Sequence, residues 1–194
     1  MQCWAPMIHR RQTGVSLTIS ITEFSSLLEA VTEIADAAGK VILEVYKSDF
    51  DVRQKGDNSP VTDADERAEA LILPALRDLL PGVPAIGEES VYRRTAEEVS
   101  GDTFWLVDPV DGTKEFLSRS GEFTVNIALI KNGAPALGIV TAPALECSYR
   151  ACGPGSAQKC HSGGQWQPIS VRRTPEEGAV VVSSRSHGDR DKLE

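Results

Sequence analysis

The hydrophobic pattern of this chain changes its period near residue 83, and this change constrains the fold more than any other feature. From Ser20 to Lys47, and again from about Asp63 to Leu80, apolar residues recur at helical spacing. Beyond Val83, apolar and polar residues alternate, which is typical of strands. Two long helices followed by strands predict an α+β fold, in which both helices pack on one face of a mostly antiparallel sheet.

Local signals mark the expected helices. Ser20 and Glu23 fit a capping box at the start of the first helix, because each side chain can bond the other's backbone N–H. Pro74 lies inside the second helix, where its missing N–H predicts a kink or an early break. Residues 48–60 form a polar connector between the two helices.

The second part of the chain contains several candidate strands. Asn132-Gly133 separates two of them and is a strong hairpin signal, because both residues tolerate positive φ. Gly163-Gly164 is a weaker signal of the same kind. The expected strands are Val83–Gly87, Thr103–Val107, Phe123–Ile130, Ala136–Thr141, Cys147–Ala151, Trp166–Val171 and Ala179–Ser183.

The charge balance limits the classes of partner. The chain has 20 basic and 28 acidic residues, so its formal net charge is −8. An acidic surface repels phosphodiester backbones and anionic lipids, and no apolar run approaches membrane-spanning length. We therefore expect no nucleic-acid polymer as a partner and no integral membrane segment. A small anionic ligand would need a bound cation or a helix N-terminus beside it.

The cysteines indicate the compartment. Cys3, Cys147, Cys152 and Cys160 form no CxxC pair and lie at no zinc-finger spacing from a histidine. We interpret them as reduced thiols of a cytoplasmic protein. Residues 1–19 are too polar for a secretory signal and are expected to form a loose N-terminal extension.

The segment WLVDPVDGTKEF, Trp105–Phe116, places two aspartates, a proline and a glycine after an apolar run. Pro109 lacks an N–H, so we expect strand pairing to stop there and the Val110 carbonyl to stay free. The Asp108 and Asp111 carboxylates and this carbonyl are hard oxygen ligands, which suit Mg²⁺ or Mn²⁺.

Gly112 and Thr113 complete this segment. Gly112 lets the backbone approach a ligand closely, and a helix that begins at Thr113 would direct free N–H groups at a phosphate. The Thr113 hydroxyl could orient a water molecule. The alternative is a plain turn, because Asp-Gly is common in turns and Asp often caps helices.

Two further acidic stretches leave two interpretations open. Glu88 follows an expected strand and either completes a metal site or belongs, with Glu89, to a solvated acidic loop. Asp65 lies three residues after Thr62, which fits a capping box at the start of the second helix. Its alternative role is that of a proton acceptor working with Thr113.

Four stretches, GDNSPVTDAD, IGEES, WLVDPVDGTKEF and GEFTVNIALI, follow one another in this order. Together they resemble the Mg²⁺-dependent, lithium-sensitive phosphatases of the inositol monophosphatase superfamily, over about Leu27 to Glu194. Within the superfamily, Lys114-Glu115-Phe116 resembles the 3′(2′),5′-bisphosphate nucleotidase group, whereas inositol phosphatases typically have Thr-Asn-Phe at this place.

The resemblance implies metal-assisted hydrolysis of a phosphomonoester. The metal ligands would be Glu88, Asp108, Asp111 and the carbonyl of Val110. They would hold two or more Mg²⁺ ions, with Mn²⁺ as a substitute and Li⁺ as an inhibitor.

The resemblance also implies the remaining roles. The backbone N–H groups of Gly112 and Thr113 would hold the phosphate, and Thr113 and Asp65 would orient or deprotonate the attacking water, with Glu88 assisting. Ser184 and His187 would contact a nucleotide, although His187 also fits a surface histidine in a polar tail. The substrate-binding set would be Glu88, Val110, Asp111, Gly112, Thr113, Ser184 and His187.

The implied reaction converts 3′-phosphoadenosine 5′-phosphate to AMP and phosphate. Two alternatives remain, namely a phosphatase for inositol phosphate or another small phosphomonoester, and a non-catalytic fragment that binds a metal or a nucleotide. The implied partner is a small phosphorylated nucleotide, with a homodimer as a further expectation. The implied location is the cytoplasm, or a peripheral position on the inner face of the membrane.

The sequence departs from the superfamily at its C-terminal end. Members continue into a second α/β domain, which completes a layered αβαβα sandwich and supplies a Trp-Asp metal ligand, but none of the tryptophans here precedes Asp. We therefore expect the N-terminal part of such a sandwich, with residues 20–182 as a metal-binding α+β phosphatase domain and 183–194 as the start of a largely missing second domain. The site would lack one carboxylate, the chain alone would be weakly active or inactive, and the exposed domain face would be apolar and aggregation-prone.

Overall fold

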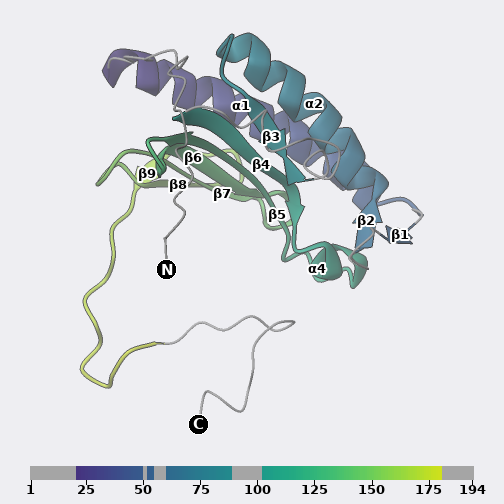
Figure 1. Cartoon of the computed structure of the whole chain (residues 1–194). Coiled ribbons are helices and arrows are strands. Elements are labelled where there is room, and N and C mark those ends of the chain that lie inside the picture. Colours follow the sequence, from purple (N-terminus) through teal and green to yellow (C-terminus); the bar gives the residue numbers. More distant parts are fainter. Residues whose placement is uncertain (1–20, 50–51, 55–59, 89–101, 181–194) are drawn as a thin grey trace, which may run out of the picture.

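The computed structural model describes residues 21–49, 52–54, 60–88 and 102–180, and Figure 1 shows their arrangement. The helices are α1 (Ile21–Tyr46), α2 (Asp63–Leu79) and the short α4 (Thr113–Leu117), and a 3₁₀ turn spans Pro143–Leu145. The strands are β1 (Val52–Gln54), β2 (Pro60–Thr62), β3 (Ala85–Gly87), β4 (Thr103–Asp111), β5 (Thr124–Lys131), β6 (Ala134–Ala142), β7 (Cys147–Cys152), β8 (Gln158–His161) and β9 (Gln167–Pro168).

The main sheet has the strand order β3-β4-β5-β6-β7-β8-β9. β3 runs parallel to β4, and every later neighbour pairs antiparallel. A separate ribbon of β1 and β2 leads directly into α2. The predicted α+β class, with a mostly antiparallel sheet, is confirmed.

The two long helices cover one face of the main sheet (Figure 1). α1 packs on β5, β6 and β7, whereas α2 packs on β3 and β4. Alternate strand residues such as Trp105 and Ile127 are buried beneath the helices, because successive side chains of a strand point to opposite faces. Leu106 and Val140 lie on the other face with 48% and 41% of their surface exposed, so this face is open and partly apolar, as expected.

The helix predictions hold, with one correction. α1 and α2 match the expected ranges, but α2 continues past Pro74 to Leu79, so the early break was wrong. Pro74 and Ala70 are both exposed, and the carbonyl that Pro74 leaves without an intrahelical partner therefore faces water. The Ser20 capping box lies outside the described residues.

The hairpin predictions also hold. Asn132 and Gly133 have φ values of 53° and 78°, and they join β5 to β6. Gly163, with a φ of 66°, lies in the connection between β8 and β9. The two-residue Asn132-Gly133 loop, with positive φ at both positions, fits the twist of β5 and β6.

Several strand predictions need correction. The stretch 48–60, which was expected to be a polar connector, contains β1 and the first residue of β2. β8 was missed, because Gln158–His161 is polar and contains none of the β-branched or aromatic residues that indicate strands. β9 is limited to Gln167–Pro168, and Val171, which was expected to extend it, is 97% exposed. Ala179 and Val180 form no strand, and the rest of that expected strand lies outside the described residues.

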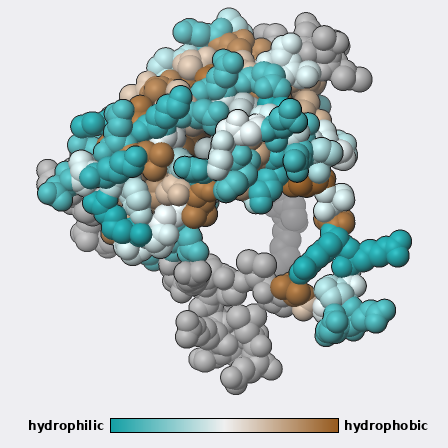
Figure 2. Space-filling model, turned by 180° about the vertical axis from the view of Figure 1, so that it is seen from behind, coloured by the Kyte–Doolittle hydropathy of each residue, from teal (hydrophilic) through white to brown (hydrophobic). Residues whose placement is uncertain are grey.

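The segment after β9 leaves the body of the molecule. Residues 169–180 extend away from the sheet (Figure 1), and Figure 2 shows the same extension from behind. On the body in Figure 2, hydrophilic residues cover most of the visible side, with hydrophobic patches between them. Among the described helices, none combines the length and the apolar character that crossing a membrane requires.

Candidate active site

The parallel pairing of β3 with β4 brings two carboxylates together. Its register sets Gly87 opposite Val107, so Glu88, just after the end of β3, lies beside Asp108 within β4. The parallel register explains how residues twenty positions apart in the sequence become neighbours. The expected pairing of Glu88 with Asp108 in space is therefore present.

Asp108 is electrostatically unusual. Burial raises the pKa of this carboxyl to about 7, and the neighbouring carboxylates of Glu88 and Asp111 add to the effect. Its Oδ1 atom is buried and has no hydrogen-bond partner among the described residues. A buried oxygen without a partner is costly, and a cation beside it would both satisfy that oxygen and favour the ionised carboxyl.

A bulge in β4 places Asp108 and Asp111 on the same side of the strand. Asp108 pairs with Asn126 and Asp111 with Thr124, so two residues of β4 oppose the single Val125 of β5. In a regular strand, residues three apart would point to opposite faces. The extra residue restores them to one face.

The bulge also corrects the expectation for Pro109. The strand was predicted to stop there, but β4 continues to Asp111, because the bulge accommodates a residue that cannot donate to the ladder. The Val110 carbonyl, expected to be free, accepts a hydrogen bond of 3.3 Å from the Thr113 hydroxyl. A carbonyl oxygen has two lone pairs, so this contact leaves room for a second partner.

Gly112 turns the chain from β4 into α4. Its φ of 91° lies in the left-handed region, which strongly favours glycine. Its carbonyl accepts the Phe116 N–H at 2.9 Å, and α4 begins at Thr113 as the sequence predicted. The helix is only five residues long, so the backbone N–H groups at its start matter more for anion binding than its dipole.

Three aromatic rings fix the position of α4. The ring centroids of Tyr46, Phe116 and Phe123 lie 5.0–5.1 Å apart, in tilted or edge-on arrangements. They join the end of α1, α4 and the segment before β5. The turn that carries Thr113 is thus held against the core.

Asp65 takes part in a capping box. Its Oδ2 accepts hydrogen bonds from the backbone N–H of Thr62 at 2.8 Å and from the Thr62 hydroxyl at 2.7 Å. The side chain is 2% exposed, and the capping interpretation is confirmed. The residues just before it, in β2, pack beside α4, so Asp65 lies in the neighbourhood of Thr113. Its role as a proton acceptor stays a prediction.

Asn126 is a site residue that the sequence reasoning missed. Its side-chain amide donates to Asp111 Oδ2 at 3.1 Å, and its Oδ1 accepts from the Thr124 hydroxyl at 3.1 Å. The available signal was a polar residue between buried Val125 and Ile127, which assigns Asn126 to the face of the aspartates. Asn126 therefore orients one of the expected metal ligands.

The carboxylates are neighbours but do not form a closed ligand set. Among the described residues, no three side chains of the metal-binding types are gathered closely enough to hold an ion. Glu88 and Asp108 lie together, whereas Asp111 bonds to Asn126. Like charges repel one another, so carboxylates converge fully only around a compensating cation. Ser184 and His187 lie outside the described residues.

A groove on the open face of the sheet begins at these carboxylates. It has a volume of about 580 Å³ and runs from Glu88, Asp108 and Asn126 to Leu106 and Val140. Its lining is acidic at one end and otherwise apolar.

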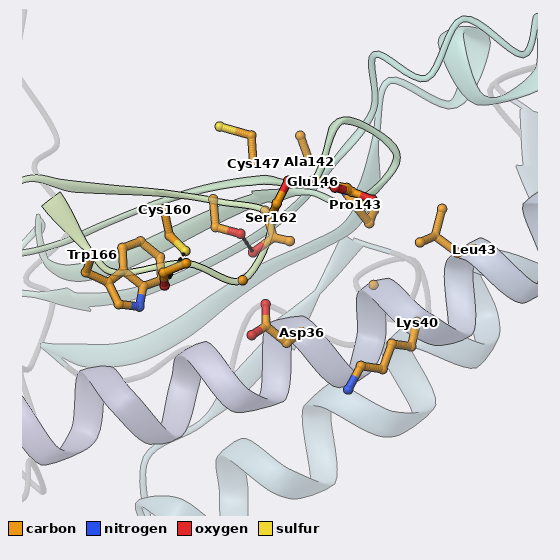
Figure 3. A pocket seen from close by; sticks show the side chains of 15 residues that line it. Asp36, Lys40, Leu43, Ala142, Pro143, Glu146, Cys147, Cys160, Ser162 and Trp166 are labelled. Carbon is orange, nitrogen blue, oxygen red and sulfur yellow. Dashed lines mark hydrogen bonds between the residues drawn. The ribbon is translucent and has the colours of Figure 1, made fainter.

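Another hollow, of about 530 Å³, lies between α1 and the far edge of the sheet (Figure 3). Asp36 and Lys40 reach it from α1, and Cys160 and Ser162 from the opposite wall. Within it, the Ser162 hydroxyl donates to the Glu146 carboxylate at 2.7 Å. With one acidic and one basic side chain on its helical wall, it offers no counterpart to the carboxylates of β3 and β4.

A sequence model of the inositol monophosphatase family matches residues 23–194. The chain belongs to the inositol monophosphatase family. Its relatives in this family include the 3′(2′),5′-bisphosphate nucleotidase CysQ of Escherichia coli (strain K12), which is 45% identical over 172 residues, covering 87% of this chain and 67% of the relative. The corresponding CysQ of Salmonella typhimurium (strain LT2) is 46% identical over the same length.

Solved structures of the family share this fold. The CysQ of Bacteroides thetaiotaomicron matches with a TM-score of 0.58 and 35% identity, over 77% of this chain and 55% of that one. The extragenic suppressor protein suhB of Bartonella henselae matches with a TM-score of 0.64 and 27% identity, over 77% and 56%. The chain thus spans about two thirds of the CysQ sequence of E. coli and about half of each of these two structures.

Proposed function

We propose that the chain belongs to a metal-dependent phosphomonoesterase that removes the 3′-phosphate of 3′-phosphoadenosine 5′-phosphate, giving AMP and phosphate. The observation that carries this proposal is the end of β4, where Asp108, beside Glu88, shares a face with Asp111 and is followed by the Gly112 turn. The similarity to CysQ proteins supports the nucleotide as substrate.

The residues present fit a divalent cation. Oδ1 of Asp108 is a buried hard donor without a partner among the described residues, and Glu88, Asp111 and the Val110 carbonyl lie at the same edge. All four donors are oxygens, which favours Mg²⁺, with Mn²⁺ as a substitute, over zinc. We also propose that the site holds two or more ions and that Li⁺ inhibits the phosphatase activity. A bound cation would supply charge compensation for the phosphoryl oxygens and lower the pKa of a water.

The chain's own groups would position the substrate and the water. The backbone N–H groups of Gly112 and Thr113 would hold phosphate oxygens. Thr113 and Asp65, assisted by Glu88, would orient the water, whose oxygen bonds to phosphorus as the bond to the 3′-oxygen breaks. Asp65 would take the water's proton, and the 3′-oxygen leaves with a proton from solvent.

Substrate choice rests on fewer residues. Lys114-Glu115 follows the Thr113 turn, and Ser184 and His187 are the proposed contacts to the nucleotide. A homodimer, and a cytoplasmic location or a peripheral position at the membrane, stay predictions. The alternative functions are an inositol-phosphate phosphatase and a non-catalytic module that binds a metal or a nucleotide.

Phosphate release distinguishes these functions. We expect the purified chain to release phosphate from 3′-phosphoadenosine 5′-phosphate in proportion to added Mg²⁺, with a higher kcat/KM than on inositol 1-phosphate. A preference for inositol 1-phosphate would support the first alternative. Absence of release, with Mg²⁺ or nucleotide binding retained in calorimetry, would support the second.

A further inference from the structure

Glu69 is a buried carboxylate that the proposed mechanism does not use. It lies on α2 one turn after Asp65, and only 8% of its surface is exposed. Burying a carboxylate is costly compared with an apolar side chain of similar size. Asp65 and Glu69 thus place two buried acids on the face of α2 that packs against β3 and β4.

Glu69 is in direct contact with the end of β3. A methyl group added at Gly87 would overlap the carboxyl group of Glu69 and would lie 2.9 Å from its Cγ. Gly87 is not among the glycines with positive φ. The backbone conformation therefore does not by itself require glycine here, but a larger residue would require Glu69 or the backbone to move.

Gly87 is the last residue of β3 and immediately precedes Glu88. The strand is three residues long, and among the described residues it lies at the edge of the sheet with β4 as its strand neighbour. Since the register of Gly87 with Val107 sets Glu88 beside Asp108, a shift of Gly87 would separate the two carboxylates.

We propose that Glu69 is a positioning residue of the carboxylate site. Its side chain fills the space above Gly87 and fixes the backbone from which Glu88 reaches Asp108. This inference rests on the proposed function, because it assigns Glu69 a role in a metal site. Glu69 contacts no substrate in this role and acts through Glu88.

The test compares five variants by their affinity for Mn²⁺, measured by electron paramagnetic resonance under conditions where circular dichroism shows each variant folded. Glu69→Ala is expected to raise the Kd about tenfold, the effect typical of residues that orient metal ligands. Glu69→Gln keeps the shape and is expected to stay within about threefold of the unsubstituted chain. Glu66→Gln, on the exposed side of the same helix, is the matched control and should leave the Kd unchanged.

The fourth and fifth variants carry Gly87→Ala, one in the unsubstituted chain and the other together with Glu69→Ala. In the unsubstituted chain it should raise the Kd at least about tenfold, because the new methyl group displaces Glu69 or the backbone. In the Glu69→Ala background the same methyl group has space, so its effect should be several times smaller. A purely structural role would lower the melting temperature and leave the Kd of the folded protein unchanged.

Three results would overturn the inference, and a fourth separates it from the proposed function. The first is a Kd that Glu69→Ala does not change, the second is an equal loss in Glu69→Gln and Glu69→Ala, and the third is an equal effect of Gly87→Ala in both backgrounds. If the unsubstituted chain binds no Mn²⁺, the proposed metal site fails, and the role of Glu69 fails with it.

Discussion

The two ends of the main sheet differ in how their charged side chains are satisfied. At the far end, in β7, Arg150 donates to Glu29 at 2.7 Å, to Gln158 at 2.9 Å and to the Thr32 hydroxyl at 3.3 Å. At the near end, Asp108 has a buried oxygen without a partner among the described residues and lies beside another carboxylate.

The difference separates a stabilising arrangement from a strained one. Arg150 joins α1 to the sheet through complementary partners, and its guanidinium also lies 4.0 Å from the centroid of the Trp166 ring. The carboxylates of β3 and β4 repel one another, which destabilises the fold unless a cation compensates them. Perturbed groups of this kind cluster at functional sites. The predictions below test this contrast.

The largest effect is expected from Asp108→Asn, which removes the charge of the carboxylate whose Oδ1 is buried without a partner among the described residues. We expect phosphate release to fall at least about a hundredfold, since a transition state rich in negative charge loses its support. The control is Asp36→Asn in the hollow beside α1, which should stay within about twofold. If Asp36→Asn lowers phosphate release and Asp108→Asn does not, the active site lies in that hollow instead.

Arg150→Ala should mainly lower stability. It removes a buried cation with three hydrogen bonds and leaves Thr32 and Gln158 without this partner, so we expect a loss of about 2–3 kcal/mol in the free energy of unfolding in urea. Arg67→Ala, whose pair with Asp63 at 3.7 Å is largely exposed, should cost at most about 0.5 kcal/mol. The Mn²⁺ affinity of the folded Arg150→Ala variant should not change. A loss of Mn²⁺ affinity alongside the loss of stability would contradict the view that the two ends of the sheet have separate roles.

The pH dependence of stability should reveal the Asp108 carboxyl. Folding raises the pKa of this carboxyl from 3.8 to about 7, so protonation of Asp108 stabilises the folded state. This stabilisation is fully present below about pH 4 and is lost as the pH rises through 7. Between pH 5 and pH 8, the free energy of unfolding should fall further in the unsubstituted chain than in Asp108→Asn. After allowance for solvent screening, we expect the two falls to differ by about 1–2 kcal/mol. Parallel pH profiles of the two proteins would show that Asp108 is not the group responsible.

The smallest effect is expected from Asn126→Ala, which releases the Asp111 carboxylate. The hydrogen bond of 3.1 Å to Oδ2 is lost, and we expect the Kd for Mn²⁺ to rise by up to about tenfold. Thr124→Val removes the hydroxyl that bonds the other end of Asn126 and should have a smaller effect in the same direction. If Asn126→Ala binds Mn²⁺ as tightly as the unsubstituted chain, Asn126 does not orient this ligand.

Features with local causes could be predicted from the sequence. The long helices, the Asn132-Gly133 hairpin and the start of α4 at Thr113 follow from periodicity and from residues that tolerate special φ values. The capping box of Asp65 was also predicted, because its partner Thr62 is three residues away.

Errors arose where the partner strand decides the outcome. A proline such as Pro109 ends a regular ladder, but the pairing of β4 with β5 absorbs it in a bulge. Gln158–His161 has little strand character of its own and becomes β8 because β7 offers it a ladder. The importance of Asn126 was hidden because its hydrogen bond spans 15 residues of sequence.

The sequence by itself therefore determined the two long helices, the Asn132-Gly133 hairpin and the capping box of Asp65, because helix periods, turns and caps depend on near neighbours. The tertiary structure alone decided that Glu88 lies beside Asp108, that Asp108 and Asp111 share a face, and that Glu69 lies against Gly87. Each of these contacts depends on the register or packing of segments distant in the chain. A shift of one residue in that register would turn the same carboxylates to the opposite face of the sheet.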